Sequence, residues 1–324
     1  MQFGLFCTYE NPQQHLPSAY AEQTELVQMV EALGFNEAWV AEHHFNPGAA
    51  SPSSLAILSY LAARTSRLRL GSAAVLLAFR DPVLVAEDVA TLDILSNGRF
   101  NFGIAKGGPF PYQNKHFGLT PADARQKTKE MLSFIQKLLY ENTASFDGAF
   151  FKAEPVELVP KPIQIPIPTF VATSTPDMIS MAAEQDYGLM AGPPFPLTVI
   201  KNYLRHYRTV APTRDPRLTV MRFYHLAETQ EQAVCEARAL LESFVDRMRK
   251  ATATMQPEWT AWMEMDRLIE DSLIGNETTI HAKIARIRQE IAPRSLILKP
   301  ISLAFEKRKQ DLRIFGERFL PTYP

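Results

Sequence analysis

The stretch that decides the fold lies at residues 3–12 and reads Phe3-Gly4-Leu5-Phe6-Cys7-Thr8-Tyr9-Glu10-Asn11-Pro12. An apolar run of strand length, Phe3–Thr8, opens the chain, and the turn that follows it contains no glycine. A doubly wound dinucleotide-binding sheet normally carries a glycine-rich turn after its first strand, because glycine lets the backbone approach a pyrophosphate closely. Its absence favours an α/β fold of the (β/α)8 class, a TIM barrel.

Short apolar runs alternate with longer helical patterns along all 324 residues, which predicts one barrel domain over residues 1–324. The runs are nearly continuous Val, Ile, Leu and Phe, as parallel strands buried on both faces should be. The predicted strands are Phe3–Thr8, Glu37–Ala41, Leu68–Leu77, Arg99–Ile104, Thr169–Thr173, Gly188–Ala191, Thr219–Leu226 and Ser295–Lys299. Helices are predicted near 18–33, 52–65, 82–95, 121–140, 176–186, 196–209, 229–250, 277–291 and 303–318.

Two segments are longer than the barrel requires, and they are predicted as insertions after strands 4 and 7. Residues 141–168 have the pattern of a hairpin followed by a proline-rich return along the outer edge. Residues 250–276 are rich in Met and Trp, and a segment of this length is either a functional lid or an extra amphipathic helix packed on the barrel.

The balance of charged residues limits the kinds of partner that the protein can bind. There are 34 basic and 35 acidic residues, and a net charge of -1 argues against a nucleic-acid partner or a role at a membrane surface. We expect no signal peptide, because the first strand begins at once, and no membrane span. Cys7 and Cys235 are expected to be buried free thiols. Together with the expected absence of a signal peptide and a membrane span, this indicates a cytoplasmic protein.

The second predicted strand ends in Glu42-His43-His44-Phe45, at the carboxyl end where barrels carry their chemistry. Neighbouring residues on a strand point to opposite faces, so Glu42 and His44 are expected to share one face and His43 the other. An imidazole at this position suits proton transfer, although a histidine at a strand end is also often a hydrogen-bonded rim residue.

Other strand ends suggest a phosphorylated cofactor that carries a ring. Lys106 stands beside two glycines, and Ser174 and Thr175 offer hydroxyl and N–H groups at the start of a helix. The small residues at Ala73, Ala74 and Ala105 would leave a flat apolar slot for a planar ring. Singly, Lys106 could be a rim lysine and Ser174 a plain helix cap, and only their convergence favours a phosphate site.

A metal centre is the weaker alternative, and we expect none. Glu42, His43 and His44 are suitable ligand types, but they diverge, and among the remaining strand ends only His225 is a further candidate. The sequence also lacks the HExxH, GxSxG and Walker patterns.

Five stretches resemble the bacterial luciferase-like flavin monooxygenases, and near His43 the pattern is most similar to the luciferase alpha subunit. The most specific of them is the run from Asp81 to Gly103. The stretches that carry the resemblance are Met1–Phe6, Ala41–Phe45, Gly71–Leu77, Asp81–Gly103 and Arg313–Pro321.

The resemblance implies a barrel that binds reduced FMN and reacts with O2 to form a peroxyflavin, which oxygenates an aldehyde or a similar small apolar substrate. It implies a separate flavin reductase, a homodimer, and His43 as the catalytic residue. It also places a non-proline cis peptide bond at Ala73-Ala74, under the flavin ring. The residues that the resemblance and the strand ends together assign to the cofactor are Ala73, Ala74, Ala105, Lys106, Thr173, Ser174 and Thr175.

Two other functions stay open. An F420-dependent oxidoreductase would share the barrel and much of the 81–103 motif. A flavin-binding protein without turnover is the other, and His43 is the feature that argues against it.

Overall fold

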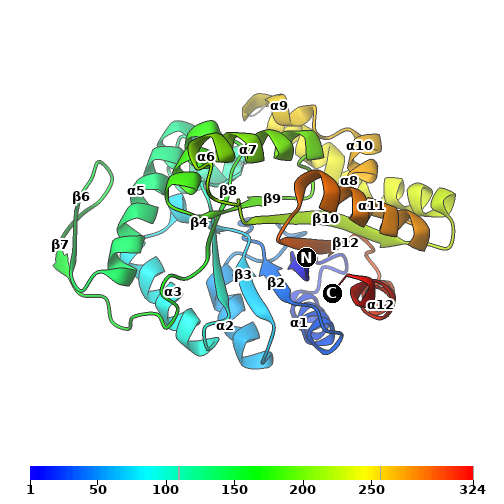
Figure 1. Ribbon diagram of the computed structural model, residues 1–324, viewed down its shortest axis with the longest axis horizontal. Helices are drawn as coiled ribbons and strands as arrows, with labels where there is room; N and C mark the ends of the chain where they lie inside the picture. The colour runs from blue at the N-terminus through cyan, green and yellow to red at the C-terminus, as the bar shows by residue number, and fades with distance from the viewer. Residues whose placement is uncertain (109, 256, 324) are drawn as a thin grey trace.

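The computed structural model of the chain describes residues 1–108, 110–255 and 257–323. Within these residues, eight parallel strands pair in a ring that closes when β10 meets β9, which confirms the predicted barrel (Figure 1). The barrel strands, in the order of the ring, are β1 (Gln2–Cys7), β2 (Glu37–Val40), β3 (Arg69–Ser72), β5 (Phe100–Ala105), β8 (Thr169–Ala172), β9 (Gly188–Ala191), β10 (Leu218–Leu226) and β12 (Ser295–Pro300).

Helices surround the ring, and their starts follow the capping residues of the sequence. Asp81 Oδ1 accepts hydrogen bonds from the amides of Val83 (2.9 Å) and Leu84 (3.1 Å), so α3 begins where its cap predicts. The helices are α1 (Leu16–Ala32), α2 (Ser54–Arg64), α3 (Pro82–Leu95), α4 (Pro111–His116), α5 (Pro121–Tyr140), α6 (Pro176–Glu184), α7 (Leu197–Val210), α8 (Gln230–Met255), α9 (Pro257–Thr260), α10 (Met265–Glu270), α11 (Glu277–Ile291) and α12 (Phe305–Ile314). In the described part of the chain, none of them is both long and apolar enough to cross a membrane.

Large side chains fill the lumen because glycines on neighbouring strands leave room for them. A Cβ on Gly71 would lie 2.3 Å from the Trp39 ring, and one on Gly188 would lie 2.3 Å from the ring of Phe170. Trp39 and Phe170 meet edge to face, with 5.2 Å between ring centroids. The middle of the barrel is therefore a packed core and not a channel.

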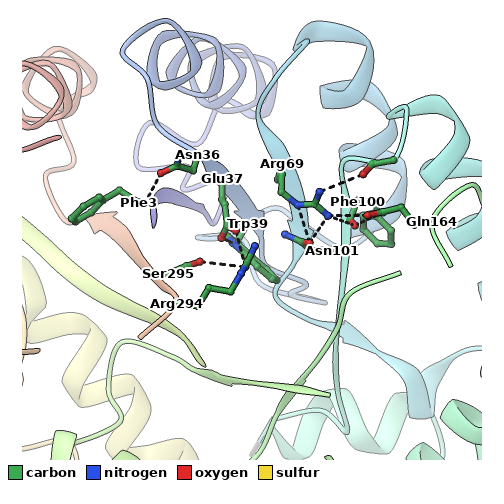
Figure 2. A network of polar contacts seen from close by, with 11 residues as sticks. Phe3, Asn36, Glu37, Trp39, Arg69, Phe100, Asn101, Gln164, Arg294 and Ser295 are labelled. Carbon is green, nitrogen blue, oxygen red and sulfur yellow. Dashed lines mark hydrogen bonds and ion pairs between the residues drawn. The ribbon is translucent and has the colours of Figure 1, made fainter. Parts of the chain in front are cut away.

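A polar layer closes the amino-terminal end of the lumen (Figure 2). Glu37 accepts a hydrogen bond of 2.8 Å from the Trp39 indole and one of 2.9 Å from the Arg294 guanidinium. Beside this pair, Arg69 donates a hydrogen bond of 2.8 Å to Asn101. The bond between Glu37 and Arg294 joins β2 to the residue that precedes β12. Since these contacts fill the amino-terminal end of the lumen, the candidate site lies at the carboxyl end.

The predicted strand Leu68–Leu77 is interrupted, so that boundary was wrong. β3 ends at Ser72, and a short strand, β4 (Val75–Leu76), follows the Ala73-Ala74 peptide bond and pairs with β5. That peptide bond is cis, as the resemblance implied. The cysteine prediction was half right, since Cys7 is buried and Cys235 is exposed.

The two insertions differ in how well the sequence predicted them. The first contains the expected hairpin, β6 (Ala144–Asp147) with β7 (Lys152–Val156), which projects from the barrel in Figure 1. The second contains a strand that the sequence did not reveal, β11 (Leu273–Gly275), which extends the sheet beside β10. At three residues, β11 is too short for its apolar pattern to stand out.

Candidate functional site

His43 lies three residues beyond the carboxyl end of β2, which ends at Val40. Glu37 and Trp39 point into the lumen, and we infer from the same alternation, continued beyond the strand, that His43 points the same way. Its amide donates a hydrogen bond of 3.1 Å to the carbonyl of Ser51. The ring atom Nδ1 is buried and has no partner among the described residues, so it is available to a bound molecule.

The charge of His43 is set by its surroundings. Burial and the positive charges of Lys299 and Arg247 lower its pKa to about 4, and the opposing carboxylate of Glu10 does not compensate. The imidazole is therefore neutral at neutral pH, which is the state that can accept a proton.

Glu42 and His44 lie on the opposite face of the same segment, as the sequence predicted. His44 Nε2 donates a hydrogen bond of 3.1 Å to Glu42, which also accepts bonds from Ser54 Oγ (2.6 Å) and Arg80 Nη2 (2.9 Å). Burial raises the pKa of Glu42, but the bond from His44 and the charge of Arg80 outweigh it and leave the pKa below its usual value. Glu42 is thus a buried anion that fixes the loop beyond β2.

The alanines of the predicted slot do come together. Ala73 and Ala105, joined by Ala172 and Phe6, pack on the lumen cluster that contains Trp39. Ala74 belongs to this cluster itself and is almost fully buried. Three strands, β1, β5 and β8, and the Ala73-Ala74 segment between β3 and β4 therefore offer small or flat apolar side chains against the filled part of the barrel.

A basic corner forms beside the start of α6. Thr173 Oγ1 accepts a hydrogen bond of 3.1 Å from the amide of Thr175, the residue that precedes the helix. Lys106 is near enough to Arg125 of α5 that its pKa is lowered, first by burial and then by the charge of this arginine. Arg125 Nε is buried and has no partner in the part of the chain that the structure describes. An anion bound here would meet both cations and the amino end of a helix.

The sequence reasoning missed the α5 side of this corner. Lys129 Nζ lies 2.8 Å from Asp177 in the first turn of α6, and Arg125 lies 4.0 Å from the same carboxylate. The available signal was the spacing of Arg125 and Lys129, four residues apart and hence on one face of the predicted helix. That spacing does not reveal which strand end the face will meet.

His225, the extra candidate for a metal, is held elsewhere. Its Nε2 atom lies 2.7 Å from Glu236 of α8, and the residue pairs with β11 and not with the barrel ring. Across residues 1–108, 110–255 and 257–323, no three His, Cys, Asp or Glu side chains gather closely enough to hold a metal ion.

The second insertion brings aromatic side chains to the loop after β9. Trp259 and Trp262 are stacked at 5.2 Å, and Phe195 lies 5.4 Å and 5.0 Å from them, between ring centroids. The segment therefore packs on the barrel rim, which agrees with the packing alternative and leaves the lid alternative open.

The site has the form of a (β/α)8 barrel whose carboxyl mouth combines a neutral histidine, an apolar shelf and a basic corner. Comparison with known proteins agrees with the barrel fold. The family model described as luciferase-like monooxygenase matches residues 1–294, and the chain belongs to that family.

Over the aligned parts, individual relatives are about a quarter to a third identical to this chain. Limonene 1,2-monooxygenase from Rhodococcus erythropolis is 27% identical, over 84% of this chain and 73% of its own length. The alkanal monooxygenase alpha chain of the Kryptophanaron alfredi symbiont is 31% identical, over 57% of this chain and 52% of its own. The chain thus spans about half the length of several curated relatives that it matches.

Solved structures agree with the fold over the full chain. The monooxygenase RslO1 from Streptomyces bottropensis superposes with a TM-score of 0.85 at 26% identity, covering 100% of both chains. The coenzyme F420-dependent tetrahydromethanopterin reductase of Methanopyrus kandleri superposes with a TM-score of 0.73 at 18% identity, covering 100% of this chain and 99% of its own, so it shares the fold.

Proposed function

We propose that this protein is a monooxygenase that uses reduced FMN and O2 to oxidise an aldehyde or a similar small apolar organic substrate. The observation that carries the proposal is the position of three features at one barrel mouth: the unpartnered Nδ1 of His43, the alanine shelf, and the basic corner at α6. Family membership and relatives named as monooxygenases support it.

The residues present fit a flavin mononucleotide. Its phosphate would meet Lys106, Arg125 and the hydroxyl and amide groups of Thr173, Ser174 and Thr175, where Arg125 Nε is buried without a partner among the described residues. Its ring would lie against the alanine shelf formed by Ala73, Ala74 and Ala105. A metal ion would find no comparable set of ligands in the described residues. When bound and reduced, the flavin supplies electrons for the activation of O2.

The protein's own residues would handle the proton. His43 is neutral, so Nδ1 can accept a proton or a hydrogen bond at the mouth and return the proton later. Trp39 and the lumen core below exclude water from that side of the shelf.

Partners follow from the same proposal. The glycine-rich turn of a tight dinucleotide site is missing after β1, so we infer that a separate flavin reductase supplies the reduced flavin. A relative from Acinetobacter baylyi that is named as the oxygenase component of a monooxygenase supports this inference. We also propose a homodimer through α2 and α3, where Tyr60, Leu84 and Leu95 are exposed. A single domain over 1–324 and a cytoplasmic location complete the proposal.

The discriminating experiment is an anaerobic binding titration of the purified chain with reduced FMN and with reduced F420, followed by product analysis under ¹⁸O-labelled O2. Tight binding of FMN and one labelled oxygen atom in the carboxylic acid formed from an aldehyde would support the proposal. Binding of F420 alone, with hydride transfer that needs no O2, would replace it with the F420-dependent alternative. Binding of FMN with no product from a broad substrate panel would favour a flavin-binding protein without turnover.

A further inference from the structure

We propose that the ion pair between Glu10 and Lys299 is a positioning device for His43, which fixes the loop that carries the imidazole and places a positive charge near it. The proposal rests on the catalytic role given to His43 above. It concerns two residues to which the proposed function gives no contact with the flavin, and it assigns them an effect on the position and charge of His43.

The topology of the barrel brings the three residues together. The order of the ring is β12, β1, β2, so Lys299 on β12, Glu10 just after β1, and His43 just after β2 stand on three consecutive strands. Lys299 shares the face of β12 with Ile297, which belongs to the lumen cluster. Its Nζ atom lies 2.5 Å from Glu10 Oε1, and its side chain is only 10% exposed, against 26% for Glu10.

A short backbone ladder connects the ion pair to His43. Glu10 forms an antiparallel bridge with Ala49, and the amide of Ala50 donates a hydrogen bond of 2.9 Å to the carbonyl of Tyr9. The next residue, Ser51, accepts the bond of 3.1 Å from the amide of His43. Lys299 therefore anchors a segment that holds the His43 backbone from the other side.

The charges of the pair act on the imidazole in opposite directions. Burial is the largest cause of the lowered pKa of His43, and Lys299, Arg247 of α8 and His44 lower it further, while Glu10 raises it. The charge of Lys299 also acts on Cys7 of β1, where burial raises the thiol pKa and keeps the thiol neutral. Since Lys299 is the first charge to act on His43 after burial, its loss has the larger consequence.

Because Lys299 and Glu10 shift the pKa of His43 in opposite directions, the proposal can be tested by removing each charge in turn. We would follow the titration of His43 by NMR in the full-length, flavin-free protein, with Lys299→Met and Glu10→Gln and with His43→Asn to assign the signal. Lys299→Met should raise the pKa of His43 by on the order of one unit, and Glu10→Gln should lower it. Both variants break the same ion pair, so a role in loop structure alone predicts the same shift in both.

Matched controls and a conservative variant complete the experiment. Lys309→Met and Glu25→Gln remove a surface pair of similar geometry, 2.7 Å between α12 and α1, and should leave the titration unchanged. Lys299→Arg keeps the charge, so His43 should titrate as in the wild type. Lys299→Gln also removes the charge and replaces Lys299→Met as the test variant if the latter does not fold. Shifts of equal sign in the two test variants, or no shift in either, would overturn the proposal.

Turnover gives a second, separate readout. If His43 is the base, the acidic limb of the pH profile of kcat/KM should move to higher pH in Lys299→Met and to lower pH in Glu10→Gln. Opposite NMR shifts without any monooxygenase activity would support the positioning device and reject the proposed function. Monooxygenase activity with no NMR shift would support the proposed function and reject the positioning device.

Discussion

Glu42 accepts a hydrogen bond of 3.1 Å from His44, and this bond separates the roles of two consecutive histidines. It ties His44 to a buried carboxylate on the outer face of the β2 segment, next to Phe79 and Phe117, whose rings lie 6.0 Å and 5.1 Å from the imidazole. The Nδ1 atom of His43 has no partner among the described residues. We therefore assign the proposed chemistry to the first histidine and a structural role to the second.

Replacing each histidine in turn should reveal this division. His43→Asn should lower kcat by roughly 10²–10³-fold, because it removes the proposed proton acceptor. His44→Asn should affect kcat much less and act mainly on stability. Steady-state rates on a substrate from the product panel, together with thermal unfolding, check both expectations. A loss of kcat in His44→Asn that equals the loss in His43→Asn, at unchanged stability, would contradict the assignment.

The basic corner predicts a selective loss of phosphate recognition. Lys106→Met and Arg125→Met should each weaken FMN binding by roughly 10–100-fold, since a hydrogen bond to a charged group contributes about 1.5–3 kcal/mol. Riboflavin lacks the phosphate, so its affinity should change little. Parallel titrations by flavin fluorescence measure the difference. Lys152→Met, on the exposed hairpin, serves as the control and should bind both flavins normally. Equal losses for the two ligands would remove the phosphate role.

The buried carboxylate of Glu42 should contribute to stability in a pH-dependent way. Glu42→Gln removes the partner of Arg80 and should cost roughly 3 kcal/mol at pH 7. The folded pKa of Glu42 is below its usual value, so its contribution is complete above about pH 4.3 and is lost as pH falls through the folded pKa. Between pH 7 and pH 3, the free energy of unfolding measured in urea should therefore decline less in the variant than in the wild type. An equal decline in the free energy of unfolding would show that Glu42 is not the group that causes the pH dependence.

The packing of the lumen can be tested with two glycines. Gly71→Ala places a methyl group 2.3 Å from the Trp39 ring and should destabilise the barrel by about 1–3 kcal/mol. Gly48→Ala is the matched control, because its nearest neighbour would be Asn46 at 3.5 Å, and it should change stability by less than about 0.5 kcal/mol. Chemical denaturation of the two variants compares them directly, and similar losses would mean that the Trp39 contact is not the cause.

The residues that the sequence predicted best are those whose position depends on local periodicity. Alternation along one strand is enough to separate His43 from Glu42 and His44, and a capping aspartate is enough to begin α3 at Pro82. The roles given to Ala73 and Lys106 remain predictions until a flavin is bound.

What the sequence did not reveal depends on contacts between distant segments. Arg125 reaches the corner near Lys106 only after α5 packs on the barrel, and β11 becomes a strand because β10 extends beyond the ring. Glu10 and Lys299 are 289 residues apart, and no periodicity in either segment indicates that they will meet.

The polar layer of Figure 2 has a consequence for the synthesis of the chain. The bond between Glu37 and Arg294 spans 257 residues, and β12, which follows Arg294, is the strand that joins β10 to β1. A nascent chain that stops before Ser295 has an open ring, an exposed edge on β1 and no Lys299 beside His43. The proposed site can therefore form only after β12 has been synthesised and has closed the ring.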